Sequence, residues 1–161
     1  MLERILVCLD GSKLAEQILP YAMEAAVRLG SKLVLLQVIV VQTPPVVAAG
    51  ASTYAVKAAG QQIEKDETEA KAYLDDLAQP PREMGLDVEC VTQRGWQIGQ
   101  TIIDYAEDHK VDLIAIATHG RSGLGRLVFG SVADFVLRES GLPILLIKPK
   151  EIGKWHITLQ V

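Results

Sequence analysis

The segment from residue 117 to residue 131 contains the densest group of residues that could do chemistry. Four glycines lie between an apolar run that ends at Ala117 and a helix-like run that begins near Ser131. Glycine allows tight turns and lets an anion approach the backbone closely. The free N–H groups and the dipole at the start of the next helix favour negative charge at the same place. The pattern therefore predicts a phosphate-binding loop.

Polar side chains in this loop fit the same prediction. Arg121 and Arg126 supply two cations, and the hydroxyl of Ser131 can add a hydrogen bond. The segment is not a P-loop, because no Lys-Ser or Lys-Thr pair follows its glycines, and it is not the dinucleotide-binding glycine motif that follows a first strand. On glycine content alone, a plain flexible loop capped by Ser131 is the alternative interpretation.

A second chemical group is expected at the end of the first strand. Asp10 follows the apolar run 5–9 and is followed by Gly11 and Ser12, which indicate a turn. We interpret Asp10 as a ligand contact, or as a helix cap, and both roles are compatible. His119 has no partner that would make it a general base, and no set of histidines shows metal-ligand spacing, so no catalytic residue and no metal site is assigned.

Alternating strand and helix patterns must position these groups. Apolar runs predict strands at 5–9, 33–41, 86–92, 113–117 and 144–147, with Gln37 as a polar exception in the second. Helical periodicity predicts helices at 14–29, 61–84, 98–109 and from 130 onward. The segment 43–59 has no periodicity and is predicted to be a surface loop, and Pro80-Pro81 is expected to end or sharply break the second helix.

This alternation predicts an α/β fold, a doubly wound parallel five-stranded sheet of Rossmann-like type with helices on both faces. In such sheets a ligand binds outside the carboxyl ends of the strands, where the direction of winding reverses. Asp10 and the glycine loop both follow strands, so we expect them to face each other across one cleft.

Composition limits the class of protein and its partners. The chain has 161 residues and a net charge of −4, which suits a single folded domain and makes nucleic acid an unexpected partner. No apolar run reaches the ~20 residues that span a bilayer, and the first strand starts too early for a signal peptide, so a cytoplasmic location without membrane contact is expected. Cys8 and Cys90 are predicted to be reduced, buried thiols.

Three segments together resemble the universal stress protein family. They are residues 5–12, residues 111–123, and residues 129–133 with 143–147 beyond them. The resemblance extends over about residues 2–149. We therefore expect one nucleotide-binding domain at 1–149 and a tail at 150–161, which is either an interface strand or a poorly ordered terminus.

The resemblance implies a site and a topology. The ATP-binding branch of the family has the motif G-x2-G-x9-G-[ST], which fits Gly120 and Gly130-Ser131, whereas Ala117 stands at the first glycine position. By resemblance, Asp10 and Val38 border the adenine and ribose. The implied contacts along the phosphates are Ala117, Gly120, Arg121, Gly130, Ser131 and Val132. The family also implies the strand order 3-2-1-4-5 and a homodimer formed through the edge of the fifth strand.

The sequence therefore favours a stress-response regulatory module that binds ATP, ADP or AMP, with Mg²⁺ as a companion of the phosphates. The absence of a convincing catalytic set in the sequence indicates at most slow ATP hydrolysis. One alternative is a dimeric interaction protein that binds no nucleotide, towards which Ala117 points. Another is an enzyme that acts on an adenylate, an idea that depends on fold analogy alone.

Overall fold

One parallel sheet organises the computed structural model, which describes residues 2–41, 53–118 and 130–150. Its strands are β1 (Arg4–Leu9), β2 (Lys32–Val40), β3 (Val88–Gly95), β4 (Leu113–Ala117) and β5 (Ile144–Ile147). The five strands lie in the order β3-β2-β1-β4-β5, and every neighbouring pair is parallel. The predicted doubly wound α/β fold is confirmed, and the winding direction reverses between β1 and β4.

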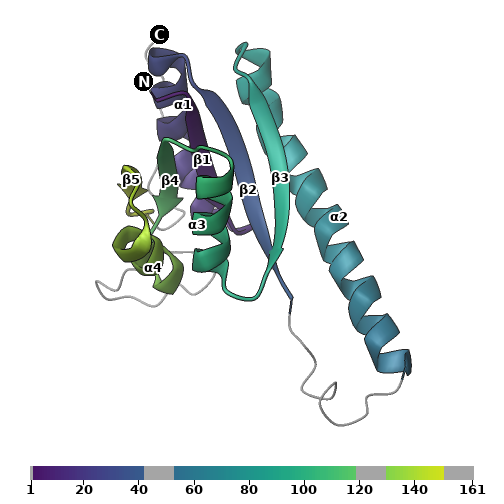
Figure 1. Ribbon diagram of the computed structural model, residues 1–161. Helices are drawn as coiled ribbons and strands as arrows, with labels where there is room; N and C mark the ends of the chain where they lie inside the picture. The colour runs from purple at the N-terminus through teal and green to yellow at the C-terminus, as the bar shows by residue number, and fades with distance from the viewer. Residues whose placement is uncertain (1, 42–52, 119–129, 151–161) are drawn as a thin grey trace.

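Helices cover both faces of this sheet (Figure 1). They are the short 3-10 helix η1 (Ala15–Ile18), α1 (Leu19–Leu29), α2 (Thr53–Glu83), α3 (Ile98–Asp108) and α4 (Ser131–Glu139). Alternate residues of each strand point to opposite faces, so Ile5 and Val7 belong to one core cluster and Leu6 and Cys8 to another. The first cluster packs under η1, α1 and α2, and the second under α3 and α4.

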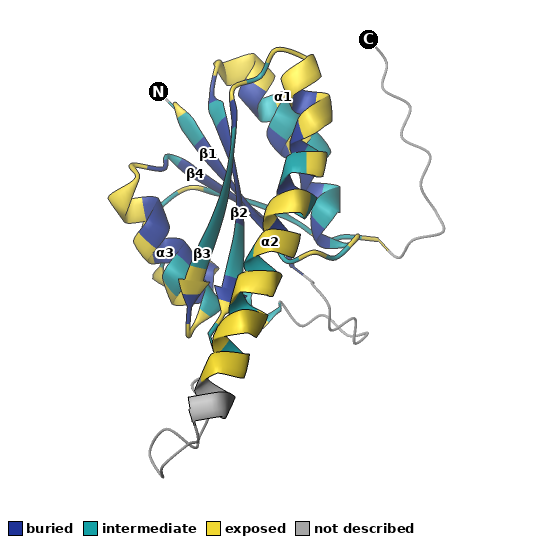
Figure 2. Ribbon diagram, turned by 90° about the vertical axis from the view of Figure 1, so that its right-hand side faces the viewer, coloured by how far each residue is buried: buried dark blue, intermediate teal, exposed yellow. Residues whose placement is uncertain are grey.

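Figure 2 shows the result of this layering: buried residues concentrate in β1 and β4, and exposed residues run along the outer side of α2. The central strands carry apolar residues on both faces because both faces are covered. None of the described helices is long and apolar enough to cross a membrane.

Helix α2 is longer than the sequence pattern predicts. The segment 43–59 was expected to be a loop, but the helix begins at Thr53, so the prediction is wrong for residues 53–59. Residues 42–52 lie outside the described part of the chain. Lys57, Ala58 and Gly60 are exposed, so this first part of the helix buries little and leaves no apolar periodicity to detect.

The prolines do not end α2 where expected. The helix runs through Pro80 and Pro81 to Glu83. Proline loses one hydrogen bond in the helix, but Pro81 is fully buried, and that packing offsets part of the loss. Helix α2 ends at Glu83, just before Gly85, which has a left-handed φ of +83°. This end lies three to four residues later than the two prolines suggest.

The third strand also differs from its prediction. Its pairing with β2 runs from Val88, opposite Leu33, to Gly95, opposite Val40, so β3 is shifted towards the C-terminus relative to 86–92. Both thiols are free: Cys8 is buried as predicted, whereas Cys90 is only half-buried. Of the tail predicted at 150–161, only Lys150 is described, and residues 151–161 lie outside the described residues.

Candidate functional site

Asp10 forms a turn at the carboxyl end of β1. Its Oδ1 accepts a hydrogen bond of 3.0 Å from the Ser12 N–H, and Gly11 takes the left-handed φ of +80° that this turn requires. The Ser12 hydroxyl oxygen then accepts the Ala15 N–H at 3.1 Å and caps η1. Ser12 thus supports the first turn of η1, and the half-buried Asp10 side chain lies at the end of the strand.

Thr118 connects the end of β4 to the start of α4. Its N–H donates to the carbonyl of Ile147 at 2.9 Å, which continues the ladder with β5. Its own carbonyl accepts the N–H of Gly130 at 2.5 Å. This bond fixes the beginning of α4 directly beside the carboxyl end of β4. Of the predicted loop residues, Gly120 and Arg121 lie outside the described residues, as does His119.

The first turn of α4 has the form expected of an anion-binding helix start. Gly130 is the residue before the helix, in an extended conformation with φ of −55° and ψ of 144°. The N–H groups of Ser131, Val132 and Ala133 have no acceptor inside the helix, because no earlier turn exists. They carry the positive end of the helix dipole. This terminus is suited to a phosphate or a carboxylate.

Strand register brings the two halves of the site together. Val7 pairs with Ala115 in the parallel ladder, so Leu9 and Ala117 end at the same level and the chain leaves β1 and β4 side by side. Leu9 pairs with Gln37 on the other side, which places Val38 one residue further along β2. In Figure 1 the carboxyl ends of β2 and β4 point to the same lower side of the sheet.

The methyl group of Ala117 lies on the side of the sheet away from α4. Leu113 and Ala115 belong to the core cluster beneath η1 and α1, and strand alternation places Ala117 on that same face. Ala117 as a whole is only 8% exposed. Val38 and Val132, in contrast, pack against the cluster on the α4 face. The methyl group that Ala117 carries in place of the motif's glycine therefore does not occupy the face on which α4 begins.

Buried polar side chains that the sequence did not reveal lie near Asp10. Tyr73 of α2 is close to Glu16 of η1 and to Asp10, and Gln37 of β2 approaches the neighbouring Gly11. Oε1 of Glu16, Oε1 of Gln37 and the Tyr73 hydroxyl are buried, and within the described residues none makes a hydrogen bond of good geometry. Burial raises the pKa of Tyr73, and the nearby charges of Glu16 and Asp10 raise it further. The one available signal was Gln37, a polar residue in an apolar strand.

The described residues offer no ready metal centre. Among them, no group of three or more His, Cys, Asp and Glu side chains is arranged to hold a metal ion.

Comparison with known proteins gives a consistent family. The model of the universal stress protein family matches residues 1–148. Universal stress protein Sll1388 of Synechocystis sp. is 28% identical over 151 residues, which are 90% of this chain and 97% of that protein. The solved structure of hypothetical protein MJ0577 of Methanocaldococcus jannaschii has a TM-score of 0.79 and 25% identity, over 93% of this chain and 98% of that one.

Two further structures carry ligands. A universal stress protein from Archaeoglobus fulgidus was solved in complex with dAMP, with a TM-score of 0.64 and 22% identity over 92% of this chain and 100% of that one. Another universal stress protein was solved in complex with cAMP, with a TM-score of 0.61 and 19% identity over 90% of this chain and 95% of that one. At these identities the likeness to this chain is one of fold.

Proposed function

Because this chain belongs to the universal stress protein family, we propose that it binds an adenine nucleotide at the carboxyl edge of its sheet, between β1 and β4. The observation that carries the proposal is the bond from the Gly130 N–H to the Thr118 carbonyl, which holds the start of α4 beside the end of β4. The start of α4 and the carboxylate of Asp10 then both lie at the carboxyl ends of β4 and β1, between which the winding direction reverses. Ligands bind at this place in such sheets.

Each proposed contact has a distinct role. Asp10 and Val38 border the ribose and the adenine, because an acidic side chain suits ribose hydroxyls and a branched apolar one suits a base. Gly130, Ser131 and Val132 hold the phosphates through their backbone N–H groups, and the Ser131 hydroxyl adds a donor. In our proposal Gly120 and Arg121 complete the phosphate side, and Ala117 forms the floor of the site.

The dAMP and cAMP complexes of two fold relatives support the ligand class. The triphosphate, as in the ATP-binding branch of the family, is the more specific part of our proposal, and Mg²⁺ would accompany it through the phosphate oxygens. Within the described residues no group of side chains is arranged to hold a metal ion, and we assign no general base. In our proposal the protein is a cytoplasmic regulatory module in a stress response, with at most slow hydrolysis of ATP.

The test is calorimetric titration of the full chain with ATP, ADP, AMP and cAMP, for the native sequence and for Gly130→Val. The φ of −55° at Gly130 is open to any residue, so valine should leave the fold intact while its branched side chain fills the place of a phosphate. We expect saturable binding of one nucleotide per chain and at least a tenfold loss of affinity in the variant.

The matched control is Gly141→Ala, because a Cβ at Gly141 would contact nothing within 4 Å. This variant should bind nucleotide as the native chain does. No binding of any of the four nucleotides at millimolar concentration, or an unchanged affinity in a folded Gly130→Val, would contradict the proposed site.

A second candidate is a dimeric interaction protein that binds no nucleotide. The observation in its favour is β5, an edge strand of the sheet whose four residues are all half-buried rather than buried. Dimerisation through this edge is also our proposal for the nucleotide-binding protein. The two functions separate in the titration above, since only the interaction protein would dimerise without binding any nucleotide.

A further inference from the structure

Lys148, which directly follows β5, lies beside the start of α4. The register of β4 and β5 pairs Ala117 with Ile147, and the Thr118 N–H donates to the Ile147 carbonyl at 2.9 Å. The same register, continued by one residue, sets Thr118 opposite Lys148. Neighbouring strands of a sheet are about 4.8 Å apart. Lys148 therefore leaves the sheet at the level at which the Thr118 carbonyl binds Gly130.

Pro149 explains why the start of α4 reaches this place. In the parallel ladder of β4 and β5, the next bond would run from the N–H of residue 149 to the Thr118 carbonyl. Proline has no N–H, so this carbonyl stays available. The Gly130 N–H donates to it instead, at 2.5 Å. Gly130 thus lies on the β5 side of Thr118, next to Lys148.

Strand alternation places the Lys148 side chain on the face of the sheet on which α4 begins. Ile144 and Leu146 pack against the core cluster beneath α3 and α4, whereas Leu145 and Ile147 pack against the cluster on the other face. Lys148 follows in the same alternation and belongs with Leu146. Its ammonium group and the free N–H groups of α4 are therefore on one side of the sheet.

The backbone of Lys148 is held on both sides, while its charge is available. Thr118 binds the carbonyl before it, and the Gln17 side chain binds both backbone groups of Lys150, accepting its N–H at 2.9 Å and donating to its carbonyl at 2.8 Å. Lys148 itself is exposed, and within the described residues it forms no ion pair. An ammonium on a flexible four-carbon stem is thus anchored at a fixed strand end.

The order of the strands relates Lys148 to one end of the ligand. In the proposed function the base lies at Val38 of β2, the ribose at Asp10 after β1, and the phosphates at the start of α4 after β4. Since the strands lie in the order β2-β1-β4-β5, the nucleotide runs across the sheet towards β5. Lys148 is then beyond the phosphate that is nearest the ribose.

We propose that Lys148 contacts the outer phosphates of a bound nucleotide and makes the site prefer ATP to AMP. This inference rests on the proposed function, and it adds a residue and a ligand preference to it. The N–H groups of α4 hold the inner phosphate, and the ammonium group of Lys148 attracts the charge that the outer phosphates add.

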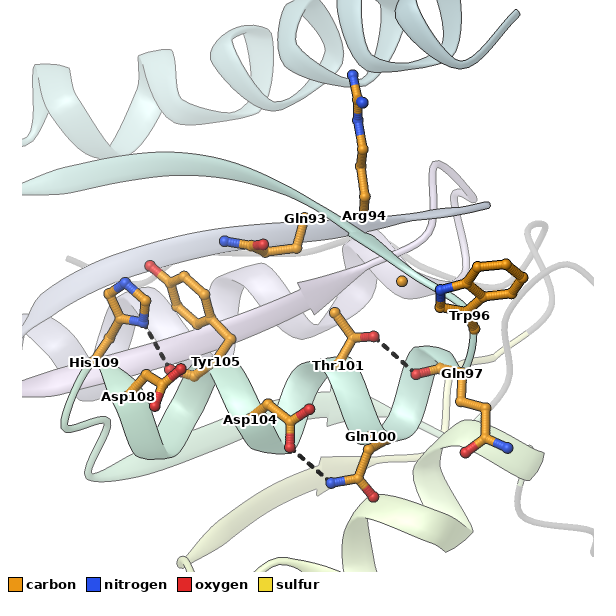
Figure 3. A pocket seen from close by; sticks show the side chains of 11 residues that line it. Gln93, Arg94, Trp96, Gln97, Gln100, Thr101, Asp104, Tyr105, Asp108 and His109 are labelled. Carbon is orange, nitrogen blue, oxygen red and sulfur yellow. Dashed lines mark hydrogen bonds between the residues drawn. The ribbon is translucent and has the colours of Figure 1, made fainter. Parts of the chain in front are cut away.

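A groove between β3 and α3 is unsuited to the same anion (Figure 3). It has a volume of about 430 Å³, and the carboxylates of Asp104 and Asp108 are among the groups that line it. The guanidinium of Arg94 points away from the groove and forms two hydrogen bonds, of 2.5 and 2.7 Å, with Glu67 of α2. A polyphosphate is therefore expected beside Lys148 rather than in this groove.

The test is calorimetric titration of the full chain with ATP and with AMP at low ionic strength, for the native sequence, Lys148→Gln and Lys148→Arg. We expect Lys148→Gln to lower the affinity for ATP by about fivefold and the affinity for AMP by less than about twofold. Lys148→Arg keeps the charge and should retain the affinity for ATP within about twofold. Lys148 is exposed, so both variants should fold.

The matched control is Lys71→Gln, which makes the same change of net charge at an exposed position on α2. It should leave the affinity for ATP unchanged. Equal losses in Lys71→Gln and Lys148→Gln would show diffuse attraction and overturn the inference. Equal losses of ATP and AMP affinity in Lys148→Gln would also overturn it, because Lys148 would then have no preference for the outer phosphates.

Inorganic tripolyphosphate, used as a second probe, separates this inference from the proposed function. We expect the native chain to bind it and Lys148→Gln to bind it more weakly. If this result came with no binding of any nucleotide, the proposed function would be wrong while the phosphate contact of Lys148 would hold. Unchanged affinities for ATP and tripolyphosphate in Lys148→Gln would overturn the inference and leave the nucleotide site intact.

Discussion

Asp10 has a structural role in addition to the ligand role that we propose. Its carboxylate accepts the Ser12 N–H and so shapes the turn after β1. Asparagine can accept the same bond, whereas alanine cannot. The two substitutions therefore separate the turn from the ligand.

We expect Asp10→Asn to keep the thermal stability of the native chain and to weaken nucleotide binding several-fold, because the charge that suits ribose hydroxyls is lost. Asp10→Ala should in addition cost about 1 kcal/mol of stability through the lost turn bond. Thermal unfolding and calorimetry of both variants check this. If a folded Asp10→Ala variant bound nucleotide with the affinity of the native chain, Asp10 would not be a ligand contact.

The two thiols should differ in reactivity. Burial raises the pKa of the Cys8 thiol to about 12. Burial, strengthened by Asp75, raises the pKa of Cys90 to about 11. Since the thiolate is the reactive form, iodoacetamide at pH 8 should label Cys90 slowly and Cys8 only after unfolding. Mass spectrometry of the labelled chain measures this, and rapid labelling of Cys8 in the native protein would show that β1 opens.

The same shifts predict a loss of stability in alkaline solution. A thiol whose pKa is raised in the folded state stays protonated there while the unfolded chain ionises, so its contribution to stability is present below pH 9 and declines from there towards pH 12. Urea unfolding at several pH values should show this decline. A chain with Cys8→Ala should show a smaller one.

At the scale of elements, the position of α4 depends on its packing against α3. Gly99 of α3 lies against Phe135 of α4, and a Cβ added there would lie 2.5 Å from Phe135 Cδ1. Because α4 carries the proposed phosphate-binding N–H groups, a change at this contact should shift α4 and so alter the site, although neither Gly99 nor Phe135 belongs to it.

We expect Gly99→Ala to cost about 1–3 kcal/mol of stability through overpacking and to weaken nucleotide binding. Combining it with Phe135→Leu should restore part of both losses, because the smaller side chain makes room for the added methyl group. Urea unfolding and calorimetry of the single and double variants provide the measurement. Additive losses in the double variant would argue against this contact.

At the scale of the whole molecule, β5 is the outermost strand on one side of the sheet, and no other strand in the described part of the chain pairs with its outer edge. The carbonyls of Pro143 and Ile147 accept N–H groups from β4, so the backbone N–H of Leu146, one residue out of phase, faces the open edge. Unpaired strand edges of this kind are surfaces on which a second chain can add.

We expect the full chain to be a dimer, with twice the mass of 17.5 kDa in light scattering. Leu146→Pro should make it a monomer, because proline removes the outward N–H. Leu146→Ala loses the same packing but keeps the N–H, and should remain a dimer. A monomeric native chain, or a dimeric Leu146→Pro, would contradict dimerisation through β5.

The pattern of the sequence determined the classes of element and most of their bounds. Apolar runs and helical spacing are local properties, so β1, β4, β5 and α3 appeared close to where the structure has them. The candidate residues Asp10 and Gly130 were also found locally, because each directly follows a strand or precedes a helix. The order of the strands came from the family resemblance and agrees with the structure.

Only the tertiary structure decided which side chains meet. Tyr73 of α2 meets Glu16 of η1 and Asp10 at the end of β1, and no local pattern encodes such a meeting. Periodicity determines which face of an element is buried, whereas the partner of that face is chosen by packing between distant segments. For this reason the sequence could predict the proposed nucleotide site, whose parts follow from strand ends, but not the meeting of Tyr73 with Glu16 and Asp10.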